Sequence, residues 1–464
     1  MRLPTKLYHI DDGVYMQKNP LTFTAVGDAI VTQKFSVYEE ESFNELIDQI
    51  QDQDVSVANL EVLLHNFEGY PAAQSGGTYM QAPPEIADEL EWAGFNLFSA
   101  ATNHAGDFSH GGMEATMQAL EERNMSYAGM GRNLAQARAP TYLDTPKGRV
   151  ALISACTTIT TGTEAGLQRP DMQGRPGISP LHLQTRYTVP EEFHEELIHA
   201  SKKLGLEAIK DRKRELGFQV PGEDSDGFTF LNIGGETDIQ FELGDRFDIH
   251  QEVNDEDAES ITKQIQAAKR QADWVFISLH SHEGTGGSRN DDTVPQFLES
   301  FARNCIDAGA DGFIGHGPHV LRGIEIYRGA PIFYSLGNFF MQNETIPNLP
   351  AEIYDRYDLD PYQSLPADLF DERIFNDEQQ RQGFTADRKF WESVLPICEF
   401  GEDGVESIEL LPLDLGYERS RPQRGRPMLA GPDVTDHVFA TVNELSSQYG
   451  TEFTEDGPVL RVDL

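Results

Sequence analysis

The chain has 464 residues, and its 77 acidic against 36 basic residues give a formal net charge of −41. This charge argues against nucleic acid and anionic membrane surfaces as partners, because both attract clusters of Lys and Arg. No apolar run approaches the ~20 residues of a membrane-spanning helix, and residues 1–20 lack the apolar segment of a signal peptide. We therefore expect a cytoplasmic protein with no transmembrane segment.

The acidic residues are spread along most of the chain, and they are dense at 252–259 and 352–378. A diffuse acidic surface is one means by which halophilic proteins stay soluble. We expect a salt-loving source organism, with an ordinary acidic protein as the alternative.

Residues 21–161 alternate short strands with helices, after a loose leader at 1–20. Apolar, β-branched runs bounded by Gly, Pro or acidic residues predict the strands, and helical spacing of apolar residues predicts the helices. The expected strands are 21–28, 54–61, 95–102, 126–128 and 150–155, and the expected helices are 43–51, 84–93 and 112–123. This alternation is typical of an α/β domain with much parallel pairing.

Residues 162–272 interrupt that alternation, and we interpret them as an insertion, a lid or a substrate-selecting subdomain. Its pattern predicts one long helical segment at 190–216 and strand-like pieces at 228–233 and 238–243.

Residues 273–340 return to the core pattern, with strands expected at 274–279, 312–316 and 331–336. An acidic surface excursion follows at 341–390. Residues 391–464 predict a closing hairpin (391–400 and 404–413), a helix at 433–449 and a last strand at 459–462.

Polar side chains stand at the ends of these core strands, and in open α/β sheets chemistry gathers at the carboxyl ends of strands. The set is Asp28, Asn59, Glu61, Asn103, His104, Asp107, His280, His282, Glu283, His316 and His319. Carboxylate, amide and imidazole donors suit divalent Mn, Fe or Zn, and the three cysteines have no metal-binding spacing. Each residue also has a structural alternative, such as a turn-forming Asp or a core histidine.

Five motifs resemble the CapA-type proteins of capsule or poly-γ-glutamate biosynthesis, a branch of the calcineurin-like metallophosphoesterase superfamily. They are Gly27-Asp28, Asn59-Leu60-Glu61, Asn103-His104 with Asp107, Gly315-His316-x-Pro318-His319 and Ser335-Leu-Gly337-Asn338, and the strand that ends at His280 adds to the resemblance. The resemblance covers about residues 21–160 and 270–340. It implies a metallophosphoesterase-like α/β/β/α two-sheet sandwich, here with an inserted α+β segment.

The resemblance also implies roles for individual residues. One or two divalent metal ions would be held by Asp28, Glu61, Asn103, His280, His316 and His319. His104 would stabilise the transition state or protonate the leaving group without binding metal. From the residues themselves, we expect Asp107 and Glu283 each to orient a histidine N–H. Supporting or substrate-contacting positions would be Asn59, His282, Glu283, Arg322 and Asn338. For Arg322 a surface salt bridge is an equal alternative.

Three positions depart from the family pattern. Ile30 stands where the superfamily has a histidine, Gly317 replaces the middle histidine of Gly-His-His-Pro-His, and Ser281 replaces a tryptophan. The site is therefore expected to hold one metal or to bind a second weakly. We expect a metal-dependent hydrolase of phosphoester or γ-glutamyl/amide bonds in a small-molecule or anionic polymer substrate. The alternative is a non-catalytic accessory factor in capsule polymer synthesis or export.

Overall fold

The structure is a computed structural model that describes residues 20–218, 228–230, 239–402 and 404–464. The leader expected at 1–20 lies outside these ranges except for Pro20, as do parts of the strand-like pieces at 228–233 and 238–243.

The first sheet is organised around β1 (Leu21–Ile30), which pairs parallel with β2 and β19 and antiparallel with β20. Its order is β23-β24-β21-β20-β1-β2-β5-β6, with β22 against β21. The other strands are β2 (Val55–Leu60), β5 (Leu97–Ser99), β6 (Ser126–Ala128), β19 (Asn338–Met341), β20 (Glu392–Phe400), β21 (Val405–Asp414), β22 (Met428–Leu429), β23 (Phe453–Asp456) and β24 (Val459–Val462). The predicted closing hairpin is the antiparallel pair β20–β21.

The second sheet has the order β17-β18-β16-β15-β9-β8, and β9, β15, β16 and β18 run parallel to one another. Its strands are β8 (Thr141–Asp144), β9 (Arg149–Cys156), β15 (Trp274–His280), β16 (Gly312–His316), β17 (Ile324–Tyr327) and β18 (Ala330–Phe333). The central strands are buried along their length, which explains their unbroken apolar sequences.

The two sheets pack face to face. Alternation along β1 sends Phe23 and Ala25 into the core between the sheets, while Val26 and Ile30 face a core on the opposite side. The ring of Phe23 stacks on Phe276 of β15, with 4.1 Å between ring centroids.

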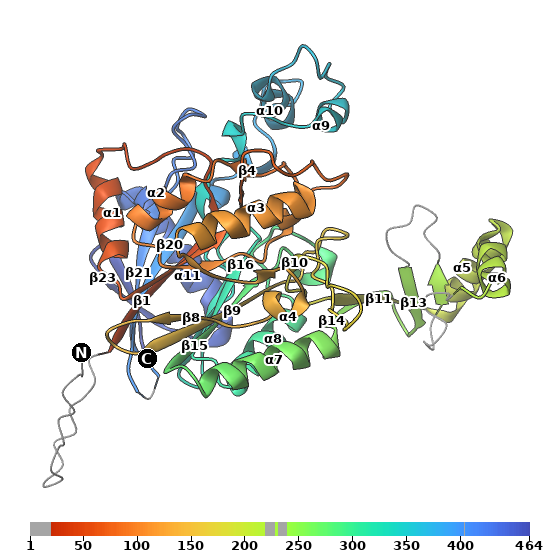
Figure 1. Cartoon of the computed structure of the whole chain (residues 1–464), viewed down its shortest axis with the longest axis horizontal. Helices are drawn as coiled ribbons and strands as arrows, with labels where there is room; N and C mark the ends of the chain where they lie inside the picture. Colours follow the sequence, from red (N-terminus) through yellow and green to blue (C-terminus); the bar gives the residue numbers. More distant parts are fainter. Residues whose placement is uncertain (1–19, 219–227, 231–238, 403) are drawn as a thin grey trace, which may run out of the picture.

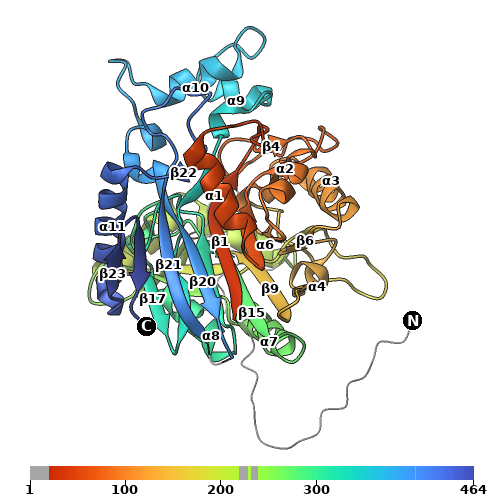
Figure 2. The ribbon, with the colours of Figure 1, turned by 90° about the vertical axis from the view of Figure 1, so that its left-hand side faces the viewer.

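Helices cover the outer face of each sheet (Figure 1, Figure 2). The first sheet is covered by α1 (Glu41–Gln51), α2 (Ile86–Trp92) and α3 (Ser109–Glu122), and the second by α7 (Asp255–Lys269) and α8 (Gln296–Asp307). The long helix α11 (Pro432–Ser446) adds Val438 and Val442 to the core between the sheets. The predicted α/β/β/α sandwich is confirmed.

Part of the 162–272 segment forms a small separate sheet, ordered β12-β13-β11-β14, that stands out from the sandwich in Figure 1. Its elements are β11 (Leu183–Val189), β12 (Phe228–Phe230), β13 (Ile239–Leu243), β14 (Asp248–Val253), α5 (Glu191–Lys203) and α6 (Leu206–Glu215). The prediction of one continuous helix at 190–216 is wrong. Gly205 between α5 and α6 has a φ of 77°, a left-handed conformation that glycine adopts without penalty and that ends a helix.

The 341–390 segment contains short helices that its sequence did not predict. These are η3 (Asn343–Thr345), α9 (Ala351–Asp355), α10 (Pro366–Ile374), η4 (Gly383–Thr385) and η5 (Arg388–Trp391). Buried residues of α9 and α10, including Tyr354 and Phe370, share a core cluster with Leu63, Tyr79 and Phe108. The excursion therefore packs onto the sandwich beside the ends of the core strands.

The remaining short elements are β3 (Leu63–Leu64), β4 (Gln81–Ala82), η1 (Asn103–Gly106), β7 (Met130–Gly131), α4 (Leu134–Ala137), β10 (Gly177–Ile178), η2 (Thr285–Gly287) and η6 (Ser447–Tyr449). Within the described ranges, no helix combines the length and apolar character needed to cross a membrane.

Candidate metal centre

The predicted site residues meet at the carboxyl ends of β1, β2, β15 and β16. Asp28 lies at a bulge in β1, where it pairs with Asn59 of β2 and Asn338 of β19. The bulge depends on Gly27, because a Cβ there would stand 1.9 Å from the carbonyl oxygen of Gly337. The backbone N–H of Asp28 donates to that same oxygen at 3.0 Å.

Asp28 is fully buried and held as a carboxylate. It accepts hydrogen bonds from the backbone N–H of Gly317 at 3.1 and 3.2 Å and from Asn59 Nδ2 at 2.9 Å. His319 Nδ1 lies 3.1 Å from its second oxygen. Burial raises the pKa of Asp28, but the hydrogen bond with His319 and the nearby histidines outweigh burial and bring it below its usual range.

Glu61 follows β2, and neither of its carboxylate oxygens has a hydrogen-bond partner among the described residues, although the side chain is completely buried. Glu61 belongs to two groups of possible metal ligands. One group is Asp28, Glu61 and His280, and the other is Glu61, His282 and His319. Within each group the ligand atoms lie within 4.8 Å of one another. Burial, followed by the charge of Asp28, raises the pKa of Glu61 well above its usual value. A divalent cation would supply the missing positive partner, so these residues fit a metal.

His282 and His319 each have a hydrogen-bond pattern that is typical of metal-binding histidines, with one ring nitrogen bound to a side-chain oxygen. The Nδ1 of His282 donates to Asn290 Oδ1 at 2.6 Å, and the Nδ1 of His319 donates to Asn338 Oδ1 at 2.9 Å. Asn338 is itself fixed, because its Nδ2 donates to the backbone carbonyls of His319 and Phe390. With Nδ1 protonated, each ring keeps its Nε2 lone pair for another partner.

His280 belongs to the group with Asp28 and Glu61, and it also contacts His282 of the other group. Its Nε2 lies 2.9 Å from Asn103 Oδ1, 3.0 Å from His282 Nε2 and 3.5 Å from Glu61 Oε1. Burial lowers the pKa of His280 to about 3, against the opposing charge of Asp28. The ring is therefore neutral, which is the form that binds metals.

His316 ends β16 and is buried, and neither ring nitrogen has a hydrogen-bond partner in the described part of the chain. Burial lowers its pKa to about 4. It lies outside both groups that contain Glu61.

His104 and Asp107 form a hydrogen-bonded pair beside these residues. His104 Nδ1 lies 2.7 Å from Asp107 Oδ2, and the backbone N–H groups of Met80 and Gly76 also donate to Asp107, at 2.7 and 3.2 Å. This contact places Asp107 where a carboxylate can fix the orientation of the imidazole.

One cavity opens onto this centre, with a volume of about 270 Å³; we call it the site cleft. Asn103, His104, His282 and His319 line it. The rest of its lining is Ile30, Ser75, Gly76, Gly77, Thr78, Met80, Thr158, Ile159, Thr160, Arg289, Asn290, Met341, Asn343, Arg373 and Phe384.

Glu283 and Arg322 shape the loop that follows β15. The Glu283 carboxylate accepts hydrogen bonds from Thr157, Thr158 and Ser281, and not from a histidine as expected. Arg322 is 1% exposed and donates to the backbone carbonyls of Glu283 and Asp291, at 2.8 and 3.1 Å. Arg322 is therefore neither on the surface nor among the residues lining the site cleft, and it stabilises the loop that carries His282.

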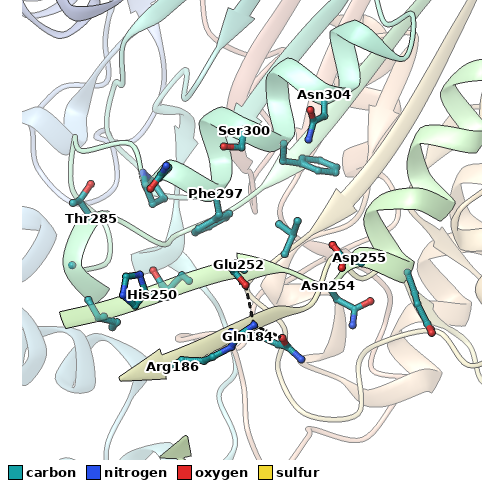
Figure 3. Close-up of a pocket in the computed structure, with 18 residues that line it drawn as sticks. Gln184, Arg186, His250, Glu252, Asn254, Asp255, Thr285, Phe297, Ser300 and Asn304 are labelled. Atoms are coloured by element: carbon teal, nitrogen blue, oxygen red, sulfur yellow. Dashed lines mark hydrogen bonds and ion pairs between the residues drawn. The ribbon is translucent and has the colours of Figure 1, made fainter. Parts of the chain in front are cut away.

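A larger hollow of about 770 Å³ lies away from this centre, between β11, β14 and α8 (Figure 3). Figure 3 shows Arg186 directed at Glu252 and Gln184, and Arg186 donates to them at 2.9 and 3.3 Å. None of the predicted site residues lines it.

Most residues that line the site cleft were not predicted from the sequence, and Asn290 and Arg373 are two of them. Asn290 follows His282 by eight residues without any motif, and Arg373 comes from the excursion at 341–390, which carries no repeat or spacing that points to a site. Contact across such sequence distances leaves no signal in a single sequence.

Comparison with known proteins adds to this geometry. The family described as Bacterial capsule synthesis protein PGA_cap matches residues 22–343. The chain is 33% identical over 439 residues to an uncharacterized protein, y4sH, of Sinorhizobium fredii, covering 93% of this chain and 91% of that one. It is 23% identical over 332 residues to capsule biosynthesis protein CapA of Bacillus anthracis, covering 70% and 61% of the two chains. It is 43% identical over 83 residues to PGA biosynthesis protein CapA of Bacillus subtilis, covering 18% and 20%.

Proposed function

The chain belongs to the PGA_cap family of bacterial capsule synthesis proteins, and on this basis we propose that it is a metal-dependent hydrolase of capsule or poly-γ-glutamate metabolism. The observation that carries the proposal is Glu61, a buried carboxylate whose unpartnered oxygens stand between two sets of ligand atoms. Such an arrangement suits two cations that share one carboxylate.

Asp28, Glu61 and His280 would hold one cation, and Glu61, His282 and His319 the other. The side chains of Asn103 and His316 complete the set of donors, and their oxygen and nitrogen atoms favour Mn, Fe or Zn. Such ions, when bound, polarise phosphoryl or carbonyl oxygens and lower the pKa of water.

His104 is the proton-transfer residue in this proposal. Asp107 accepts the Nδ1 proton of His104, which leaves Nε2 for the site cleft. From there a doubly protonated His104 donates its Nε2 proton to the leaving oxygen of a phosphoester or the leaving nitrogen of an amide, and it regains a proton from water. Hydrogen bonds from two backbone N–H groups keep Asp107 in place while this occurs.

The bond that is cleaved is a phosphoester or a γ-glutamyl amide, because the same donor set serves attack at phosphorus and at a carbonyl carbon. The printed names of the two Bacillus relatives connect them with capsule and PGA biosynthesis. We therefore place poly-γ-glutamate first among the substrates to test, together with simple phosphoesters.

A non-catalytic binding role is the second candidate, and Ile30 favours it. Ile30 occupies the position at which the superfamily resemblance implies a histidine, and it lines the site cleft as an apolar side chain. The first cation would then lack one donor, and the chain would bind polymer without cleaving it.

Hydrolysis assays distinguish the two candidates. We expect the Mn-loaded chain to cleave p-nitrophenyl phosphate, bis(p-nitrophenyl) phosphate or poly-γ-glutamate. We expect His104→Ala to lower kcat about 10²- to 10⁴-fold while the bound metal is retained. The control, His199→Ala, changes an exposed histidine of α5 and should match the wild type. Equal kcat in His104→Ala and the wild type would refute the catalytic role, and no cleavage of any substrate would favour the binding factor.

A further inference from the structure

The charge of the site cleft is opposite to that of the protein as a whole. Acidic residues outnumber basic ones 77 to 36 in the chain. Yet the residues that line the site cleft include Arg289 and Arg373 and no Asp or Glu, within the described ranges. The carboxylates of Asp28 and Glu61 lie outside that lining, and a bound cation would neutralise them.

Arg373 belongs to α10 and reaches the cleft as a half-buried side chain. Its Nη1 donates to Thr78 Oγ1 at 2.6 Å, and Thr78 is itself a buried residue of the cleft wall. Among the described residues, no carboxylate lies within ion-pair distance of this guanidinium. The tether to Thr78 uses one donor of a group that has five, so most of its hydrogen-bonding capacity remains for a ligand.

The segment that carries Arg373 is anchored to the rest of the chain by ion pairs. Arg421 contacts Asp371 of α10 and lies 3.3 Å from Glu344, and Arg424 also pairs with Glu344. These contacts fix the segment around α10, and the hydrogen bond to Thr78 keeps the guanidinium in the cleft wall, so binding requires little ordering of Arg373.

A second, smaller cavity of about 150 Å³ lies next to the site cleft and is lined in part by α10. The residues that line both cavities are Met341, Asn343, Arg373 and Phe384. Arg373 thus stands where the two cavities meet. A substrate longer than the reacting group can extend past Arg373 into this second space.

Arg289 comes from the loop after β15 and is largely exposed. Its guanidinium lies 3.5 Å from Glu283, whose carboxylate already accepts hydrogen bonds from Thr157, Thr158 and Ser281. Arg289 is therefore weakly held and free to turn toward an anion in the cleft.

We propose that Arg373, assisted by Arg289, binds a second anionic group of the substrate, a carboxylate or a phosphate, apart from the bond that is cleaved. The substrate is then a polyanion, and α10 supplies its specificity from beyond the region 22–343 that matches the family. Arginine suits this task because its planar guanidinium forms paired hydrogen bonds with either group. This inference rests on the proposed function, which places the bond that is cleaved at the metal centre.

The test uses the full-length, Mn-loaded chain and isothermal titration calorimetry with two probes, tetra-γ-glutamate and inorganic phosphate. Arg373→Met keeps most of the side-chain stem and removes the charge, and Arg373→Lys keeps the charge. The matched control is Arg356→Met, an exposed arginine just after α9 in the same segment. We expect Arg373→Met to lower the affinity for one of the probes about 10- to 100-fold. Arg373→Lys should lower that affinity less, and Arg356→Met should bind both probes as the wild type does.

The two probes identify the source of the anion. A loss confined to tetra-γ-glutamate assigns the site to carboxylates, and a loss confined to inorganic phosphate assigns it to phosphate groups. Unchanged affinity of Arg373→Met for both probes would overturn the inference, as would a wild-type chain that binds neither. Metal content measured on the same samples separates this result from the proposed function. A wild-type chain without metal contradicts the metal centre, whereas unchanged binding with metal present contradicts only the role of Arg373.

Discussion

Glu61 is buried although no donor among the described residues stabilises its charge. Removing a carboxylate from water without a partner costs several kcal/mol, and the raised pKa of Glu61 expresses that cost. Glu89 shows the opposite case in the same protein. Its buried carboxylate accepts hydrogen bonds from the backbone N–H groups of Phe35 and Ser36 and from the Ser36 hydroxyl.

Replacing each of these glutamates by glutamine should therefore change the free energy of unfolding in opposite directions. In chelator, Glu61→Gln should raise the free energy of unfolding by about 1–3 kcal/mol, because it removes an unpaired buried charge. Glu89→Gln should lower the free energy of unfolding by about as much, because three charge-assisted hydrogen bonds are lost and an amide nitrogen replaces one of the two accepting oxygens. Thermal unfolding in EDTA and in Mn measures both. A Glu61→Gln variant that is less stable than the wild type in EDTA would show that Glu61 has a stabilising partner.

The sequence alone predicted Asp28, Glu61 and His280, because each stands at or near the end of an apolar strand. It did not decide the role of His282, because β15 ends at His280 and strand alternation no longer determines where the next side chains point. It missed Arg373 because α10 reaches the cleft through tertiary packing alone.

At the scale of elements, the site depends on how closely β1 approaches the turn before β19. Gly27 lies against the carbonyl of Gly337, and this contact creates the bulge that places Asp28 beside Asn59 and Asn338. A side chain at position 27 would separate the strands at the point where the ligands converge.

Gly27→Ala should therefore destabilise the protein by about 2–4 kcal/mol and weaken metal binding. The matched control is Gly431→Ala before α11, where the φ of −75° suits alanine and nothing lies within 4 Å of an added Cβ. Thermal unfolding and metal titration of both variants check this. Equal behaviour of the two alanine variants would contradict the role assigned to the bulge.

The sequence predicted the core elements well, because their apolar runs are long and their ends carry Gly, Pro or acidic residues. It failed at 190–216, where the helical pattern continues through Gly205 although the backbone turns there. It also failed at α10, whose nine residues are too few to show a clear helical period.

At the scale of the whole molecule, the net charge of −41 produces repulsion that salt would screen. The screening length falls from ~10 Å at 0.1 M to ~3 Å at 1 M, so most of this repulsion disappears over that range. The salt-loving source expected from the acidic composition stays a prediction, and this screening makes it testable.

We predict that the Tm rises by about 5 °C or more between 0.1 and 1 M KCl, because the folded state concentrates the negative charges that the unfolded chain separates. Calorimetry over a KCl series measures this, with sucrose of equal osmolality as the control for non-ionic effects. A Tm that stays constant or falls with KCl would contradict the halophilic interpretation.

The central claim is that Glu61 and the residues around it form a metal centre, and metal content tests it most directly. Elemental analysis would be made on protein purified in high salt without chelator, for the wild type, Glu61→Gln and the control Glu89→Gln. The account predicts one or two equivalents of Mn, Fe or Zn in the wild type and in Glu89→Gln, and a loss in Glu61→Gln. No metal in the wild type, even after Mn or Zn is added back, would contradict it.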